Sequence, residues 1–249
     1  MKFRSKLIIT AIVSYLVFLI ATAPASLLFK FAHGQVQAGA ISGTAWHGKA
    51  GTLQAGILNL GDAEWNLHVL PLFVGRVVAD VKLVQQKGFA QGQVSASLGG
   101  QLKLNQFSAS LPFDSLLGSG GLPSGWTGTA QIKLDELVLK NNWPVAAKGT
   151  VDALDVTGPA NAPVNLGNYR VTFPAADSTA SSLVGDLQDQ SGAAISLSGK
   201  LIIGTDRSYQ LNTNVAARPN TPESISQGMQ YLGEPDAQGR RPFTVSGTM

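Results

Sequence analysis

The sequence predicts a mainly β protein, in which an N-terminal single transmembrane helix precedes a long, curved antiparallel β-sheet or sandwich with one or two short helices. Three observations predict this class. Residues 7–29 form an apolar run without any charge. Between residues 35 and 215, short runs with an apolar period of two are bounded by Gly, Asn, Asp or Pro. A period of 3.6 is almost absent from the same region, so strands are expected to dominate it.

The N-terminus predicts a membrane anchor over residues 7–29, since about 20 apolar residues suffice for a helix to cross a bilayer. A cleaved signal peptide is the alternative, because Ala21-Thr22-Ala23 has the small residues that signal peptidase accepts. Pro24 and the apolar residues after it argue against cleavage. Lys2, Arg4 and Lys6 place residues 1–6 in the cytoplasm by the positive-inside rule. Residues 30–249 then form a β domain on the far side of the membrane, which in a bacterium is the periplasm, and the protein is expected to be single-pass.

Two segments alternate and then shift phase by one residue. The runs Leu102–Leu104 and Ile132–Leu134 each carry apolar residues on one face. After each run the alternation slips, which indicates a β-bulge or a tight bend. Gly-Thr followed by an apolar residue recurs five times, and we interpret each as a strand start: Gly43, Gly51, Gly128, Gly149 and Gly247. Their irregular spacing excludes a propeller and favours a meandering antiparallel sheet.

Helical segments are few after residue 30. Residues 111–117 allow one or two turns, and Thr221-Pro222 resembles the start of a short helix that ends at Gly233. The Gly- and Pro-rich stretch 118–125 predicts either a hinge between two halves of the sheet or an ordinary loop.

The charge balance excludes a nucleic-acid partner. Three of the 18 Lys and Arg residues lie in the first six positions, so the rest of the chain balances its 15 Asp and Glu. A nucleic-acid binder needs a clustered basic face, which this neutral body lacks. The chain contains no Cys, which excludes disulfides, thiolate metal sites and Cys nucleophiles.

No catalytic or cofactor motif is complete. Residues 43–50 fit the frame of a phosphate-binding loop but end in Ala50 instead of Ser or Thr, and a strand-like run follows, so no nucleotide is expected. The histidines, His33, His47 and His68, lack the spacing of a helical zinc pair. Four carboxylates, Asp135, Glu136, Asp186 and Asp189, are interpreted as solvated loop residues. The sequence therefore predicts no catalytic residue, no metal and no cofactor, and it predicts that the protein is not an enzyme.

The four tryptophans lie in or beside predicted strands: Trp46, Trp65, Trp126 and Trp143. We interpret them as packing against the sheet face, and an exposed aromatic row that contacts a partner or a lipid is the alternative.

Several motifs in order resemble one known family. After the anchor come residues 41–50 (ISGTAWHGKA), then residues 64–67 with 70–76, which hold Trp65 and a Leu-Phe-Val-Gly-Arg segment. Further matches are residues 142–149, 166–169, 199–201 and 231–239. In order and in length, the whole chain resembles protein N of the bacterial type II secretion system (the general secretion pathway).

The resemblance implies a non-catalytic inner-membrane component that supports export of folded proteins from the periplasm across the outer membrane, as an assembly or scaffolding subunit. It implies the inner-membrane platform proteins and the outer-membrane secretin as partners. The residues that carry the family signature are expected to be structural: Gly43, Trp46, Gly48, Trp65, Gly75, Trp143, Gly149, Gly167, Gly199 and Gly233.

A second interpretation belongs to another class. One-sided anchored β-sheets also resemble the periplasmic AsmA-like proteins, which would make the chain a lipid-binding or lipid-handling protein. The difference lies in where Leu102, Leu104, Ile132 and Leu134 point: a sealed core favours the scaffold, which we prefer, and an open apolar groove favours lipid. A periplasmic hydrolase is a distant third, because no nucleophile motif is present.

Overall fold

The computed structural model describes residues 2–27, 36–55, 58–97, 99–115, 125–158, 163–174 and 182–248. The chain divides into two compact units, residues 1–86 and residues 87–249. The predicted hinge at 118–125 lies outside the described residues except for Gly125.

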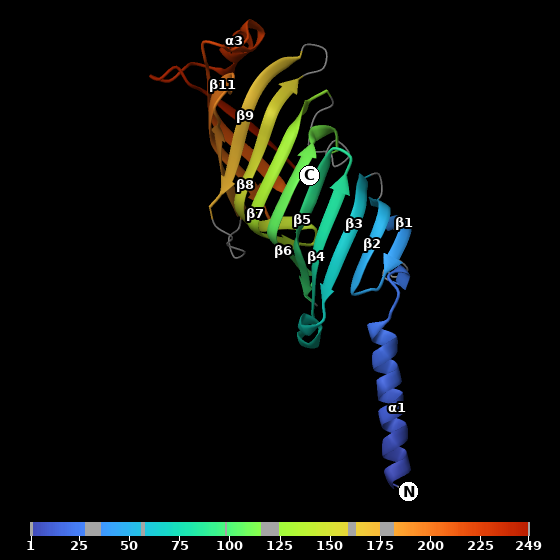
Figure 1. Ribbon diagram of the computed structural model, residues 1–249. Coiled ribbons are helices and arrows are strands. Elements are labelled where there is room, and N and C mark those ends of the chain that lie inside the picture. Colours follow the sequence, from blue (N-terminus) through green and yellow to red (C-terminus); the bar gives the residue numbers. More distant parts are fainter. Residues whose placement is uncertain are drawn as a thin grey trace. The chain divides into compact units, whose positions relative to one another are not determined.

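Unit 1 holds one long helix and a four-stranded antiparallel meander (Figure 1). Its elements are α1 (Lys2–Ala21), β1 (Val36–Gly43), β2 (His47–Ala55), β3 (Leu58–His68), the 3-10 helix η1 (Leu70–Val74) and β4 (Arg76–Gln85).

Unit 2 is a longer antiparallel meander with a short helix near its C-terminal end. Its strands are β5 (Gly88–Ser97), β6 (Gln101–Pro112), β7 (Thr127–Lys140), β8 (Trp143–Gly158), β9 (Val164–Phe173), β10 (Ser182–Asp189), β11 (Ile195–Gly204), β12 (Ser208–Ala217) and β13 (Arg241–Thr248). Its helices are the 3-10 helix η2 (Phe113–Ser115), α3 (Glu223–Met229) and the 3-10 helix η4 (Gln230–Leu232). Each strand pairs with the next along the chain.

The predicted mainly β class and its antiparallel meander are confirmed, but several details of the prediction are wrong. The expected helix at 111–117 is a strand through Pro112 followed by η2. Of the five Gly-Thr pairs, only Gly128-Thr129 lies at a strand start. Gly43 ends β1, Gly51 and Gly149 lie inside strands, and Gly247 lies near the end of β13. The helix at 221–233 is confirmed as α3 with η4, although Pro222 rather than Thr221 is its N-cap.

The N-terminal helix is shorter than the apolar run predicts. α1 ends at Ala21, and Pro24 forms an antiparallel bridge with Thr44 instead of continuing the helix. Proline has no N–H to donate and excludes helical geometry from the residue before it, which explains the stop. In the part of the chain that the structure describes, no helix combines the length and the apolar character that a membrane crossing requires. The predicted transmembrane span over residues 7–29 is therefore not supported.

In unit 2, the strand register places apolar residues opposite apolar residues and polar residues opposite polar ones. Because side chains alternate between the two faces of a strand, each cross-strand row of residues lies on one face. One row is apolar apart from Gly199 and Thr213, and runs through Ala90, Ala109, Ile132, Val151, Val171, Leu187, Gly199, Thr213 and Phe243. The neighbouring row is mostly polar and runs through Phe89, Ser110, Gln131, Asp152, Arg170, Gln188, Ser198, Asn214 and Pro242. Unit 2 thus has an apolar inner face and a polar outer face.

An ion pair strengthens the polar row. The Arg170 guanidinium donates two hydrogen bonds to Asp152, from Nε to Oδ1 at 2.5 Å and from Nη2 to Oδ2 at 3.0 Å. Asp152 is 8% exposed, so its carboxylate would be costly to bury without this partner.

The inner face forms two clusters. In the first, Leu134, Ala147, Phe173 and Leu183 are buried, and apolar residues from β6 to β11 pack around them. Leu201 and Ile203 of β11 join this cluster although their strand lies three positions beyond β8, so the sheet curls until β8 and β11 approach. The second cluster, around Phe113, Ala130 and Val156, includes Trp126, Leu166 and Tyr169.

Bulges accompany the curl, and two of them lie where the phase shifts predict irregularity. In β6 Gln106 has φ +49°, and opposite it the β7–β8 register shifts between Leu134 and Glu136. At this bulge Gly149 has φ +135°, and an added Cβ would lie 2.2 Å from the Lys133 carbonyl oxygen. Glycine is therefore required there.

Adjacent residues of β10 provide a test of the two faces. Leu183 is 6% exposed in the first cluster, and Val184 is 37% exposed on the opposite face. We expect Leu183→Ala to lower the free energy of unfolding by about 2–5 kcal/mol, because it leaves a cavity. Val184→Ala, the matched control, should change it by less than about 1 kcal/mol. Urea unfolding followed by circular dichroism measures both, and equal losses would contradict the assignment of faces.

Candidate functional site: an apolar cavity beside helix α3

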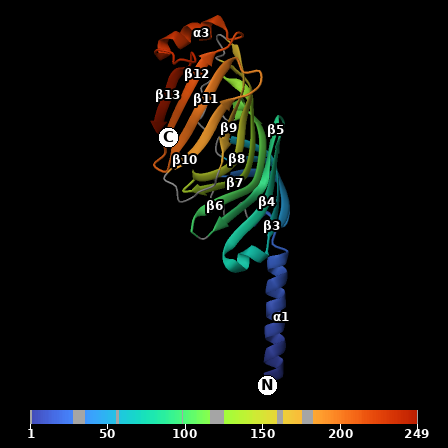
Figure 2. The same ribbon diagram turned by 90° about the vertical axis from the view of Figure 1, so that its left-hand side faces the viewer.

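A cavity of about 580 Å³ lies in unit 2 between the inner sheet face and the α3–η4 segment. Figures 1 and 2 show α3 at the end of the strands near β11 and β12. From the sheet the cavity is lined by Tyr169, Leu187, Ile195, Leu197, Val215 and Phe243, and at one end by Trp126, Val156 and Leu166. From the helical segment it is lined by Ser224, Ile225, Gly228, Met229 and Leu232.

The sequence makes both walls apolar through two different periods. Ile195 and Leu197 alternate along β11, so both face inward, and Leu197 pairs with Val215 of β12. On the other wall, Ile225, Met229 and Leu232 recur at helical spacing, which turns them to one side of the α3–η4 segment. Met229 is 8% exposed. The cavity is the space that these two apolar surfaces leave between them.

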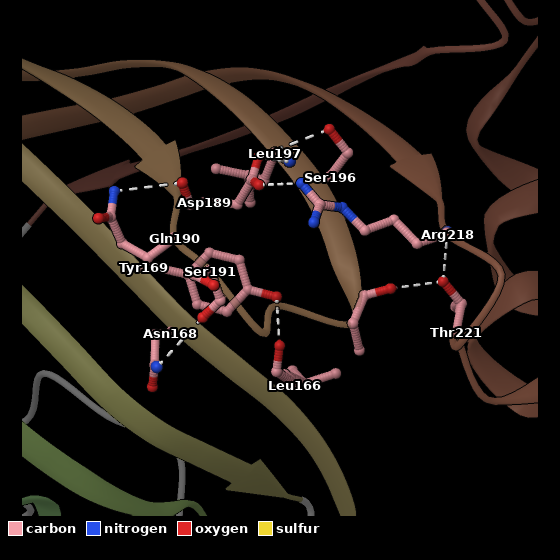
Figure 3. Close-up of polar contacts among 11 residues, drawn as sticks. Leu166, Asn168, Tyr169, Asp189, Gln190, Ser191, Ser196, Leu197, Arg218 and Thr221 are labelled. Atoms are coloured by element: carbon pink, nitrogen blue, oxygen red, sulfur yellow. Dashed lines mark hydrogen bonds and ion pairs between the residues drawn. The ribbon is translucent and has the colours of Figure 1, made fainter.

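Polar contacts hold the N-terminal side of α3 against the turn between β10 and β11 (Figure 3). Thr221 Oγ1 donates to the Ala194 carbonyl at 2.5 Å and accepts from the Arg218 backbone N–H at 2.6 Å. The Arg218 guanidinium donates to Asp189 Oδ2, and the other carboxylate oxygen accepts from the Leu197 N–H at 2.8 Å. Two side chains therefore fix where α3 begins.

Arg241 holds the C-terminal side of the segment. Arg241 Nη1 donates to the Gly233 carbonyl, and Gly233, with φ +96°, ends η4. Arg241 is the first residue of β13. The α3–η4 segment is thus tied to the sheet at both ends, while its middle contacts the sheet through apolar side chains.

Among the described residues that line the cavity, Tyr169 is the one with a titratable side chain. Its hydroxyl donates to the Leu166 carbonyl at 2.9 Å. Burial, with a contribution from the nearby Asp189 carboxylate, raises the pKa of Tyr169 to about 12. The phenol is thus neutral at physiological pH, and its hydroxyl proton is engaged in a hydrogen bond to a backbone carbonyl.

The arrangement can bind an apolar molecule. The volume falls within the range of small-molecule sites, which are mostly apolar with a few polar groups. Within the described ranges, no three His, Asp or Glu side chains gather closely enough to hold a metal ion.

Four of the signature residues meet at the β1–β2 turn of unit 1. Gly43, with φ +89°, opens the turn, and Trp46 Nε1 donates to the Ile20 carbonyl at 2.8 Å. Trp65 Nε1 donates to the Ala45 carbonyl at 3.2 Å, and its ring covers Gly48, where a Cβ would lie 2.5 Å from Cζ2. The segment that fits a phosphate-loop frame is therefore a strand turn that leads into β2.

The other signature residues lie apart from one another. Gly75 ends η1, Gly149 lies at the bulge, and Gly233 ends η4. Gly167 and Gly199 lie where strands or turns pass closely: an added Cβ would be 2.5 Å from the Gly192 oxygen and 2.1 Å from the Asn212 oxygen, respectively.

Trp143 lines a second, more polar hollow of about 720 Å³ with Lys140 and Arg207, and its indole N–H donates to the Gly204 carbonyl at 2.8 Å. Trp126 packs in the second cluster and against Gly158. Trp65, Trp126 and Trp143 thus contact strands and turns, whereas Trp46 contacts the last turn of α1.

The candidate titratable groups of the sequence are not brought together. His33 lies outside the described residues, and His68 Nε2 lies 2.8 Å from Asp80 Oδ2 at an exposed position. The interpretation of four carboxylates as loop residues is wrong. Asp135 and Glu136 lie in β7, where they pair with Lys148 and Lys103. Asp186 and Asp189 lie in β10, and the Asp189 side chain is only 16% exposed.

The residues of the cavity were missed at the sequence level. Their signal is present as alternation over residues 195–203 and 209–215 and as helical spacing over 225–232. Neither pattern shows that the two surfaces face each other.

Fold and site together define a class: an antiparallel β protein in two units, with an apolar cavity on the inner face of unit 2. The family model for the type II secretion system, protein N, matches residues 34–244. The chain therefore belongs to the type II secretion system protein N family, and the resemblance seen in its motifs is confirmed.

Individual relatives of the chain carry the name of the same family. The chain is similar to type II secretion system protein N of Aeromonas hydrophila, 28% identical over 98% of this chain and 99% of the relative. It is also similar to type II secretion system protein N of Vibrio cholerae serotype O1, 27% identical over 84% of this chain and 83% of the relative. No solved structure matches the chain.

The Tyr169 pKa predicts a pH dependence of stability. A folded pKa of about 12 against an ordinary value of 10 stabilises the fold fully below pH 10, and this contribution is lost as the pH rises from 10 to 12. We expect Tyr169→Phe to remove that decline. Urea unfolding between pH 9 and 12 measures it, with Tyr231→Phe, at a position 91% exposed, as the control that keeps the wild-type profile. An unchanged decline in Tyr169→Phe would contradict the assignment.

Proposed function

We propose that this protein is a non-catalytic assembly or scaffolding subunit of the bacterial type II secretion system, which supports export of folded proteins from the periplasm across the outer membrane. The observation that carries the proposal is the family match over residues 34–244, which includes nearly all strands of both units. The cavity supports a non-catalytic role, because its walls are apolar and its one titratable side chain, Tyr169, is neutral and bonded to backbone.

The proposed location of the protein is the periplasmic side of the inner membrane, to which α1 attaches it. Large apolar side chains described between Leu7 and Ile20 are 46–62% exposed around the helix. Exposed apolar surface of this extent, on the part of α1 that follows Lys6, favours contact with another apolar phase, and the proposed attachment to a bilayer supplies that phase. Other secretion proteins are the proposed partners, namely the inner-membrane platform and the secretin of the outer membrane.

Gene deletion tests the role in secretion. Without the gene, the fraction of a secreted enzyme found in the medium should fall to that of a strain without the secretin, and the enzyme should collect in the periplasm. The wild-type gene should restore export. A variant with His33, His47 and His68 all changed to Ala, present at wild-type level, should restore it equally, because no histidine chemistry is needed. Unchanged export after deletion would contradict the role, and failure of the triple variant would contradict the non-catalytic assignment.

A second candidate function is the binding of a lipid or another apolar chain, and the cavity beside α3 is the specific observation in its favour. A sealed core would leave no cavity beside α3. The cavity that is present has the size and the apolar lining of a small-molecule site. Of the four side chains that discriminate the two functions, Ile132 and Leu134 belong to the first core cluster. The apolar inner face is thus filled at one end and hollow at the other.

Filling the cavity tests this second function. Gly228 lines it, and a Cβ added there would meet no atom within 4 Å, so Gly228→Phe can occupy the space. Gln227→Phe, on the neighbouring exposed position of α3, is the matched control. Native mass spectrometry should detect a co-purified phospholipid or fatty acid with wild type and Gln227→Phe, and severalfold less with Gly228→Phe. Equal lipid in all three proteins, or none in wild type, would contradict lipid binding at this site.

A further inference from the structure

Unit 1 exposes a compact apolar tip between β3 and β4. The tip comprises residues 69–74, that is η1 and the residue before it. Leu70, Phe73 and Val74 are 81%, 84% and 73% exposed, and η1 contains no buried residue. Single exposed apolar residues are ordinary, but adjacent ones on a turn mark a surface that another apolar phase covers.

Hydrogen bonds place this tip at the end of unit 1 where α1 stops. The Leu67 N–H, three residues before η1, donates to the Trp46 carbonyl at 2.6 Å. The Trp46 indole N–H in turn donates to the Ile20 carbonyl at 2.8 Å, in the last turn of α1. In Figures 1 and 2 the teal turn between β3 and β4 lies beside the end of α1 that faces the strands.

A second set of bonds holds α1 to the same sheet. The Ala45 N–H donates to the Ala23 carbonyl at 2.8 Å, and the Ala25 N–H donates to the Gly43 carbonyl at 3.2 Å. Together with the Pro24–Thr44 bridge, these bonds connect the helix end to the β1–β2 turn at several points. The η1 tip and the end of α1 are therefore neighbouring parts of one body.

The chemistry of this end suits the boundary between lipid headgroups and acyl chains. Trp46 lies at the helix end, and Trp is enriched at membrane interfaces because its ring is apolar and its N–H is polar. Arg76 is exposed two residues after the tip, where its cation can meet anionic headgroups. Apolar side chains followed by a cation are the composition of interfacial membrane contacts.

We propose that the η1 tip inserts into the interface of the bilayer that holds α1, which makes it a second membrane contact of unit 1. The inference rests on the proposed membrane attachment through α1. One helix leaves a protein free to rotate and tilt on its anchor, whereas a second contact beside it restricts both motions. The tip would thereby set the direction in which β1–β4 rise from the membrane.

Single-cysteine labelling tests the proposal, because the natural chain contains no Cys. The full-length chain carries the fluorophore NBD at Val74→Cys, with Leu70→Cys as a second position on the tip. Val13→Cys reports on α1, where Val13 is 52% exposed. Gln86→Cys, exposed beyond the far end of β4, is the matched control in the same unit. Each protein is reconstituted into vesicles of phosphatidylethanolamine and phosphatidylglycerol, with and without spin-labelled lipid.

We expect a blue shift, a severalfold rise in emission, and quenching by headgroup-proximal spin labels at positions 74 and 70, and no such change at position 86. A lipid signal at position 13 with none at 70 and 74 would overturn the tip contact while leaving attachment through α1 intact. No lipid signal at position 13 would overturn both. A blue shift at the tip without quenching by spin-labelled lipid would assign it to a protein surface and overturn the proposal, as would an equal lipid signal at position 86.

Discussion

The apolar side chains on the inner face of unit 2 must be buried away from water, and this constraint shapes the rest of that unit. Its cross-strand rows place apolar side chains on one face of a meander in which each strand pairs only with its neighbours along the described chain. Buried apolar surface is worth roughly 25 cal/mol per Å², so leaving the face open to water is unfavourable. The sheet curls so that β8 and β11 approach each other. Gly149 and Gly199 lie where the backbone of a neighbouring strand comes too close for a Cβ atom.

One end of the inner face of unit 2 is covered by other strands of the sheet, and the other end is covered by the α3–η4 segment. Near Leu183, strands pack on strands and leave a filled core. Near Tyr169 the cover is the α3–η4 segment, tied by Thr221, Arg218 and Arg241 at its two ends. A short segment held at its ends opens more easily than a strand inside a ladder. The cavity therefore lies under the part of the cover that can open with the least loss of sheet pairing.

Unit 1 presents apolar surface outward where unit 2 turns it inward. α1 and η1 expose their large apolar side chains, and the bonds through Trp46 bring them to the same end of the unit. Trp46 and Gly43 thus serve a joint between helix and sheet, although their segment resembles part of a nucleotide loop in sequence. A segment without catalytic groups can thus still have a structural role, because it positions one element against another.

The sequence by itself determined the β class, the meander, the bulges near Gln106 and Glu136 and the helix ending at Gly233, because alternation, phase slips and stop residues are local properties. It also determined the family, through the order of its motifs. The apolar run placed the end of the N-terminal helix too late, because Pro24 stops α1 at Ala21. The bridge that Pro24 then forms with Thr44 joins distant segments, so the sequence did not show it. Nor did it reveal the cavity or the role of Asp189, because both depend on strands far apart in the chain meeting under α3. Only the tertiary structure decided those features, since packing between distant segments is not encoded in any one stretch.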